Sequence, residues 1–146
     1  MTIIIQKPTE IDEELFESIL HLLPQLNIRH PLPTFSDVTD LLTSNSSTLF
    51  VARYPNITDP IVGMLTLAIF RLPSGIRAHI EDLVVDHELR NKGIAHALIT
   101  MALQTSLSIR ANGVTLTSNS HRTSAIRLYE SLVFKKWDTN LFFYQF

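Results

Sequence analysis

The feature that most constrains the fold is a change of pattern in the middle of the chain. Two β-rich apolar runs, "IVGMLTLAIFRL" (61–72) and "AHIEDLVVD" (78–86), are separated by a turn sequence. A helical pattern follows from residue 94 and ends at the C-cap signal Asn112-Gly113, and a short β-rich run occupies 114–118. Consecutive strands joined by turns pair antiparallel, whereas a strand, helix, strand order requires a parallel crossover. We therefore predict a mixed sheet flanked by helices.

The remaining segments complete this expectation. Besides the helix from residue 94, apolar periodicity and caps predict one helix before Pro24, another that begins after Thr34 or Ser36, and a last one within 120–134. Strands are expected in 2–8, in 47–54 and in the aromatic end 135–146. The fold class is α/β (α+β), with about four helices.

Composition limits the classes of function. The chain has 146 residues, 45% hydrophobic and 18% charged, and a formal net charge of -2. One domain over 1–146 is expected, and the scattered basic residues do not indicate a nucleic-acid partner. "MTIIIQKPTE" is too short in its apolar part for a membrane span or secretory segment, so we expect a cytoplasmic protein without a membrane partner.

The stretch "VVDHELRNKGIAHALI" (84–99) joins a strand to a helix through a single glycine. Free backbone N–H groups at a helix start bind anions, above all phosphate, and Arg90 and Lys92 add positive charge beside Gly93. A second glycine for a dinucleotide fingerprint and a Gly-Lys-Ser/Thr sequence are both absent. The alternative is an ordinary turn between exposed charges.

The six histidines do not indicate a metal site. Their spacing contains neither HxH nor HExxH, and the chain has no cysteine. We therefore expect no metal.

Two segments resemble the GNAT superfamily of acetyl-CoA-dependent N-acetyltransferases. "LVVDHELRNKGIAHALI" is similar to its cofactor loop, with Arg90, Gly93 and Ala95 at the loop's characteristic positions. "VTLTSNSHRTSAIRLYESLVF" resembles its second cofactor segment, with Ala125 to Tyr129 on the helix. The resemblance is close over 61–136 and agrees in element order over the whole chain. It implies a single GNAT-like domain whose mostly antiparallel sheet of six to seven strands is splayed at the cofactor site.

The resemblance also implies where acetyl-CoA, the cosubstrate, binds. The loop amides would hold its pyrophosphate, and the end of the central strand would pair with pantetheine. Asn119 would contact pantetheine, and Arg122 and Arg127 are candidates for contacts near the adenosine phosphates. The loop residues are Arg90, Asn91, Lys92, Gly93, Ile94, Ala95 and His96, and the strand residues are Leu83, Val84 and Val85.

Acetyl transfer needs a base for the acceptor amine and an acid for the departing thiolate. Glu81 and Asp82 are the candidate bases, and strand alternation is expected to send them to opposite faces; Glu81 is favoured because relatives carry carboxylates there, and a water chain is the alternative. The resemblance makes Tyr129 the proton donor to the coenzyme A sulfur, although Tyr129 also fits a core aromatic. His30 is a candidate acceptor contact.

Two positions depart from the family pattern. Ala95 stands where glycine is frequent, which leaves cofactor binding expected. Val133 replaces the usual glycine after the last helix, and a β-branched residue is poor at a left-handed cap, so we expect the exit from that helix to differ.

The function expected is transfer of an acetyl group from acetyl-CoA to a primary amine of a small molecule or peptide, directly in a ternary complex. The alternatives are a non-catalytic GNAT-fold sensor of acyl-CoA and an interaction domain without cofactor. A homodimer is possible through the aromatic end "LFFYQF".

Overall fold

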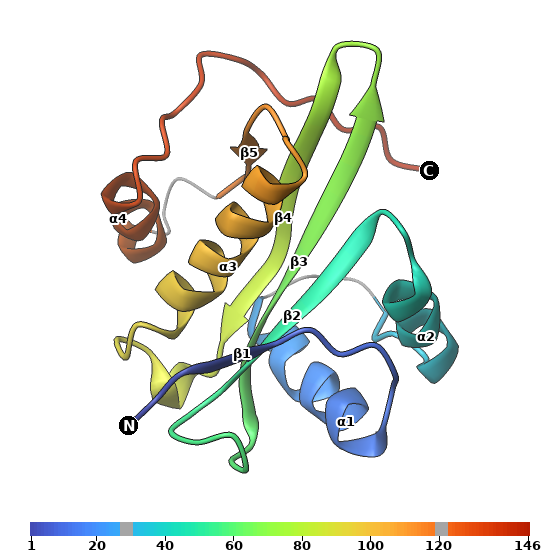
Figure 1. Cartoon of the computed structure of the whole chain (residues 1–146), viewed down its shortest axis with the longest axis vertical. Helices are drawn as coiled ribbons and strands as arrows, with labels where there is room; N and C mark the ends of the chain where they lie inside the picture. Colours follow the sequence, from blue (N-terminus) through green and yellow to red (C-terminus); the bar gives the residue numbers. More distant parts are fainter. Residues whose placement is uncertain (27–30, 119–122) are drawn as a thin grey trace. The chain divides into compact units, whose positions relative to one another are not determined.

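The computed structural model describes residues 1–26, 31–118 and 123–146, which form two compact units, 1–116 and 117–146 (Figure 1). The second unit contains α4 (Thr123–Ser131). The first unit contains the other elements, in chain order β1 (Ile4–Gln6), α1 (Glu13–Leu22), η1 (Leu23–Leu26), α2 (Phe35–Thr43), β2 (Ser47–Arg53), β3 (Ile61–Leu72), β4 (Gly75–Val85), η2 (His87–Leu89), α3 (Ile94–Ser108) and β5 (Val114–Thr115).

The sheet has the strand order β1-β2-β3-β4-β5, with β1 to β4 antiparallel and β5 parallel to β4. This confirms the mixed, mostly antiparallel sheet. The expected six to seven strands are wrong for the described residues, which form five, because residues 135–146 are coil. The aromatic side chains of this end are exposed, Phe142 for example by 89%, so no neighbouring strand buries them.

The pairing of β4 with β5 is very short. Only two residue pairs join them, Ala78 with Val114 and His79 with Thr115. Residues 80–85 of β4 have no strand on that side within the described part of the chain, and we call them the open edge. The sheet therefore splays where the cofactor strand was expected.

Helices cover both faces of the sheet, with α1 and α2 on one face and α3 on the other (Figure 1). Buried residues of α1 and α2 pack against Leu49, Val51, Met64 and Val84. On the opposite face Gly63 lies under α3, where a Cβ would approach side-chain atoms of Ile94 and Leu98 to 3.2 and 3.3 Å. The absence of a side chain at Gly63 thus lets α3 lie close to β3.

The helix boundaries follow from local caps. Asp12 caps α1, and Thr34 forms a capping box with Asp37 at the start of α2. The predicted end of α3 at Asn112-Gly113 is wrong: α3 ends at Ser108, and Arg110 takes the left-handed conformation (φ 61). Asn112 instead binds the β3–β4 turn through Ser74 and Ile76. Among the described helices, none is both long and apolar enough to cross a membrane.

Candidate functional site

The segment before α3 exposes backbone amides. Gly93 is the N-cap of α3 with a left-handed φ of 84, and no side chain caps the first turn. A Cβ on Gly93 would meet only Ile3, at 3.8 Å, so the positive φ and not a lack of space explains the glycine. First-turn N–H groups lack intrahelical acceptors and lie at the positive end of the helix dipole. The segment therefore offers several donors to an anion.

Charge and backbone around these amides also suit an anion. Arg90, Asn91 and Lys92 are exposed beside Gly93, and Asn91 is itself left-handed (φ 62). The predicted loop residues 90–96 thus lie in one turn and the helix start that follows it. This donor set fits a pyrophosphate group.

The open edge adjoins this turn along the chain. Leu83, Val84 and Val85 lie on it, two of them half-buried and Val84 buried. A strand edge without a partner can pair with an extended ligand that carries amide groups, as pantetheine does. The residues expected to hold pantetheine therefore have a suitable backbone setting.

A β-bulge on β4 contains Asp82, one of the two candidate bases, and directly follows the other, Glu81. Thr66 pairs with Glu81 and Met64 pairs with Val84, so one residue of β3 faces Asp82 and Leu83 together. Asp82 has a φ of 49. The bulge interrupts the alternation that the sequence predicts for this strand, and it gives Glu81 and Asp82 different surroundings.

Asp82 lines a cavity of about 130 Å³ between β3, β4 and the helices α1 and α2. Most of its wall is apolar, with Asp37 and Thr66 as further polar residues. The pKa of Asp37 lies below its ordinary value because the Thr34 backbone N–H and hydroxyl hydrogen-bond its carboxylate. Sequence reasoning missed this cavity, since no local pattern brings α2 and the bulge together.

Glu81 lies outside the cavity wall but is the register partner of Thr66, which is part of it. Its Oε1 atom lies 2.8 Å from Nε2 of His79, and its side chain is 57% exposed. The two acids therefore differ in what surrounds them: Asp82 faces the cavity, and Glu81 belongs to a polar contact on β4.

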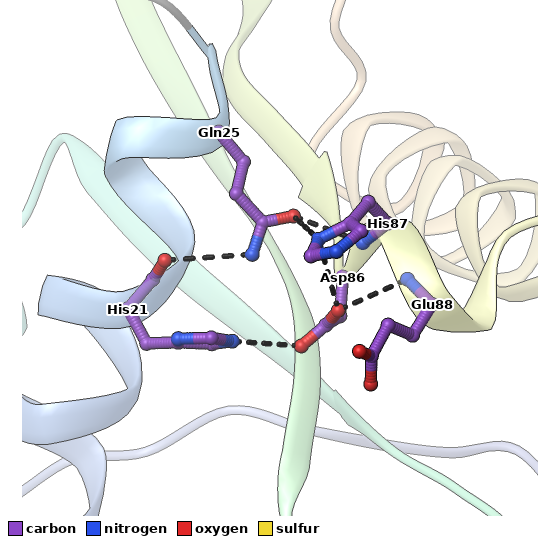
Figure 2. Close-up of polar contacts among 5 residues, drawn as sticks. All are labelled: His21, Gln25, Asp86, His87 and Glu88. Carbon is purple, nitrogen blue, oxygen red and sulfur yellow. Dashed lines mark hydrogen bonds and ion pairs between the residues drawn. The ribbon is translucent and has the colours of Figure 1, made fainter.

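A second polar cluster ties α1 to the turn that precedes the loop (Figure 2). Nε2 of His21 lies 2.8 Å from Oδ2 of Asp86, and the Gln25 side-chain oxygen accepts the His87 backbone N–H at 2.9 Å. The Asp86 carboxylate also accepts the Glu88 backbone N–H at 3.1 Å. The contacts of His21 with Asp86 and of Gln25 with His87 join residues more than sixty positions apart, and no local sequence pattern predicts them.

The charge of Asp86 depends on this cluster. Partial burial works to raise the pKa of Asp86, but the hydrogen bonds from His21 and the Glu88 amide, with the charges of His21 and His87, hold it below its ordinary value. Asp86 is thus a stable anchor for the start of the loop.

The second unit holds the candidate acid, Tyr129, on α4. Tyr129 is buried and its ring contacts Phe134 edge to face, with centroids 6.2 Å apart. Val133 has a φ of 67, and the amides of Val133 and Phe134 bond the carbonyls of Glu130 and Tyr129. This is a Schellman motif with valine at the left-handed position, so the expected change of helix exit is wrong.

Four further residues were predicted to contact the substrate or the cofactor. His30, Asn119 and Arg122 fall outside the described residues, and Arg127 is exposed on α4. Within 1–26, 31–118 and 123–146, no three His, Asp or Glu side chains are grouped so that they could hold a metal ion.

Comparisons with known proteins show the family and the fold of the chain. The sequence profile of the Acetyltransferase (GNAT) family matches residues 13–134. The chain is 37% identical over 68 residues to streptothricin acetyltransferase of Escherichia coli; the match covers 47% of this chain and only 39% of that protein.

Two solved structures share the fold. An aminoglycoside acetyltransferase from an uncultured soil metagenomic sample, solved in complex with trehalose, has a TM-score of 0.84 at 24% identity, covering 99% of this chain and 95% of that one. An acetyltransferase of Trypanosoma brucei has a TM-score of 0.79 at 25% identity, covering 99% and 100%.

Proposed function

The chain belongs to the Acetyltransferase (GNAT) family, and from this premise we propose that it is an N-acetyltransferase that moves an acetyl group from acetyl-CoA to a primary amine of a small molecule. The observation that carries the proposal is the uncapped start of α3 at left-handed Gly93, next to the open edge of β4. Together they offer donors for a pyrophosphate and a backbone edge for pantetheine.

The residues would divide the work of binding as follows. Amides from Asn91 to His96, with Arg90 and Lys92, would hold the pyrophosphate, and Leu83 to Val85 would pair with pantetheine. Asn119 would also contact pantetheine, and Arg127 would lie near the adenosine phosphates. Bound there, acetyl-CoA supplies the acetyl group as a reactive thioester.

The acceptor amine would enter the cavity beside Asp82. Its mostly apolar wall with the carboxyl-bearing residues Asp37 and Asp82 favours a cationic group carried on an apolar stem. At about 130 Å³ the cavity is smaller than most ligand pockets, so it would receive the amine-bearing end of an acceptor and not a whole amino sugar antibiotic.

Direct transfer in a ternary complex requires two proton movements. The C–N bond forms as the C–S bond breaks; Glu81 would take the proton from the amine, and the Tyr129 hydroxyl would give one to the departing thiolate. Asp82 would hold the ammonium form of the acceptor. A backbone amide of Leu83 or Val84 is the expected donor to the acetyl oxygen.

The experiment is a coenzyme A release assay on a panel of amines that includes streptothricin-like and aminoglycoside antibiotics, since the relatives' names point to them. We expect turnover by the wild type and about 100-fold lower kcat for Tyr129→Phe, with unchanged acetyl-CoA affinity. Tyr144→Phe, an exposed tyrosine in the same unit, is the matched control and should behave as wild type.

Acetyl-CoA binding is measured separately by thermal shift. A ligand at 100 times its Kd stabilises a protein by about 2.7 kcal/mol, which is readily observed. Stabilisation without turnover on any amine would replace the enzyme by a non-catalytic acyl-CoA sensor. Absence of both stabilisation and turnover would exclude the enzyme and the acyl-CoA sensor, and would favour an interaction domain without cofactor.

A further inference from the structure

Three polar side chains form a continuous hydrogen-bonded chain across β4 and β5. Nδ1 of His79 lies 2.7 Å from the Thr115 hydroxyl oxygen, and Nε2 of the same ring lies 2.8 Å from Oε1 of Glu81. The Thr115 hydroxyl also lies 3.4 Å from the Ala78 carbonyl oxygen.

The strand register places this hydrogen-bonded chain of side chains on the face of the sheet that bears the cavity. His79 pairs with Ala68 and Glu81 with Thr66, while Met64, two residues before Thr66, belongs to the same cavity wall. His79 is also the residue opposite Thr115, in the last β4–β5 pair before the sheet opens. The hydrogen-bonded chain thus runs from the last β4–β5 pair, beyond which the sheet opens, to Glu81, whose register partner Thr66 lines the cavity.

The protons on this chain can be assigned from chemistry. An ionised Glu81 only accepts hydrogen bonds, so Nε2 of His79 must carry a hydrogen. In the neutral ring Nδ1 then accepts the Thr115 hydroxyl. In the charged ring Nδ1 donates to that hydroxyl, which can turn to the Ala78 carbonyl.

We propose that His79 is a positioning residue for Glu81, and that Thr115 fixes the tautomer with which it does so; the inference rests on the proposed function. The bond to Oε1 holds a side chain that is 57% exposed, and it would leave Oε2 for the acceptor amine. The His79 side chain is only 19% exposed, so the ring is a firmer support than Glu81 could find in solvent. In this arrangement Glu81 is the base and His79 is the third group that orients its side chain.

The test compares four variants for kcat, KM and acetyl-CoA affinity on the best amine of the panel. His79→Ala removes the support and should lower kcat about 10-fold or more, with acetyl-CoA affinity unchanged. His79→Gln, whose amide can donate to Glu81, should recover most of that loss. Thr115→Val should fall between them. Arg77→Gln, an exposed β4 residue two positions earlier, is the control and should match wild type.

Ring ¹⁵N chemical shifts supply a readout that does not need turnover. The neutral His79 ring should carry its hydrogen on Nε2 in the wild type and become a mixture of tautomers in Thr115→Val. A wild-type ring with the hydrogen on Nδ1, or a fully active His79→Ala, overturns this inference alone. A wild type that acetylates no amine overturns the proposed function and the positioning role of His79 with it.

Discussion

The backbone passes through a left-handed residue both before α3, at Gly93, and after α4, at Val133, with φ values of 84 and 67. Before α3 the residue is a glycine, and the turn is anchored from far along the chain by the contact of Asp86 with His21. After α4 the residue is β-branched, and the contacts are local: the Schellman bonds and the ring contact of Phe134 with Tyr129.

The difference shows two ways of fixing a functional group. The proposed pyrophosphate site has an unstrained backbone whose position depends on distant residues. The proposed acid is held by its own helix end, at the cost of strain at Val133. Replacing the left-handed residue should therefore weaken acetyl-CoA binding at Gly93 and raise the stability of the protein at Val133.

Among substitutions that test this comparison of the two left-handed residues, the largest effect is expected for Gly93→Ala. A Cβ at a left-handed position costs about 1–2 kcal/mol, and a shift of the loop to relieve it would misplace the amides. We expect acetyl-CoA Kd to rise about 10-fold, measured by calorimetry. Gly113→Ala is the matched control because a Cβ there meets nothing within 4 Å and the φ is not positive. Equal affinity of the two variants would contradict the role of the Gly93 conformation.

A smaller effect is expected for Asp86→Asn, which should lower the free energy of unfolding by about 1 kcal/mol at neutral pH, measured by urea denaturation. Folding lowers the pKa of Asp86, so its contribution is present above about pH 4, the value of an unfolded aspartate, and is lost as the pH falls through the folded pKa.

The wild type and Asp86→Asn should therefore have nearly equal free energies of unfolding at low pH. Asp40→Asn, an exposed aspartate of α2, should stay close to wild type at every pH. A difference between wild type and Asp86→Asn that grows on acidification would refute the sign of this linkage.

The smallest effect is a gain. Val133→Gly relieves about 1–2 kcal/mol of left-handed strain and adds about 0.5–1 kcal/mol of chain entropy to the unfolded state, so a net stabilisation of about 0.5 kcal/mol is expected. Val133→Ala keeps the Cβ and should gain less. Thermal unfolding measures both, and a destabilised glycine variant would mean that the Val133 side chain makes contacts that outweigh the strain.

The sequence predicted the parts that depend on local chemistry. Turn residues and apolar runs placed β2, β3 and β4 within a few residues, and the Thr34 cap placed α2. The strand, glycine and helix order predicted the loop at Gly93. These signals are local because caps and turns satisfy the hydrogen bonds of neighbouring residues.

What could not be predicted depends on register or on residues far apart. The bulge at Asp82 arises from how β4 pairs with β3, and alternation within β4 alone suggests otherwise. His79 could have been noticed, since it lies two residues before Glu81 on one strand face. The end of α3 was misplaced because Arg110, and not glycine, takes the left-handed position.

The bulge in β4 also acts as a shift of phase along the strand. In a regular strand Ile80 and Val84, four positions apart, would share a face. Through the bulge Ile80 pairs with Leu67 and Val84 with Met64, three positions away on β3, so the two side chains lie on opposite faces. The bulge therefore lets His79 and Glu81, at odd positions, lie on the same face of the sheet as Val84, at an even position. On that face Val84 fixes the strand in the core. Deleting one residue at 82–83 would restore a regular ladder in which Glu81 still pairs with Thr66 and Val84 with Met64, so both halves would keep their present faces.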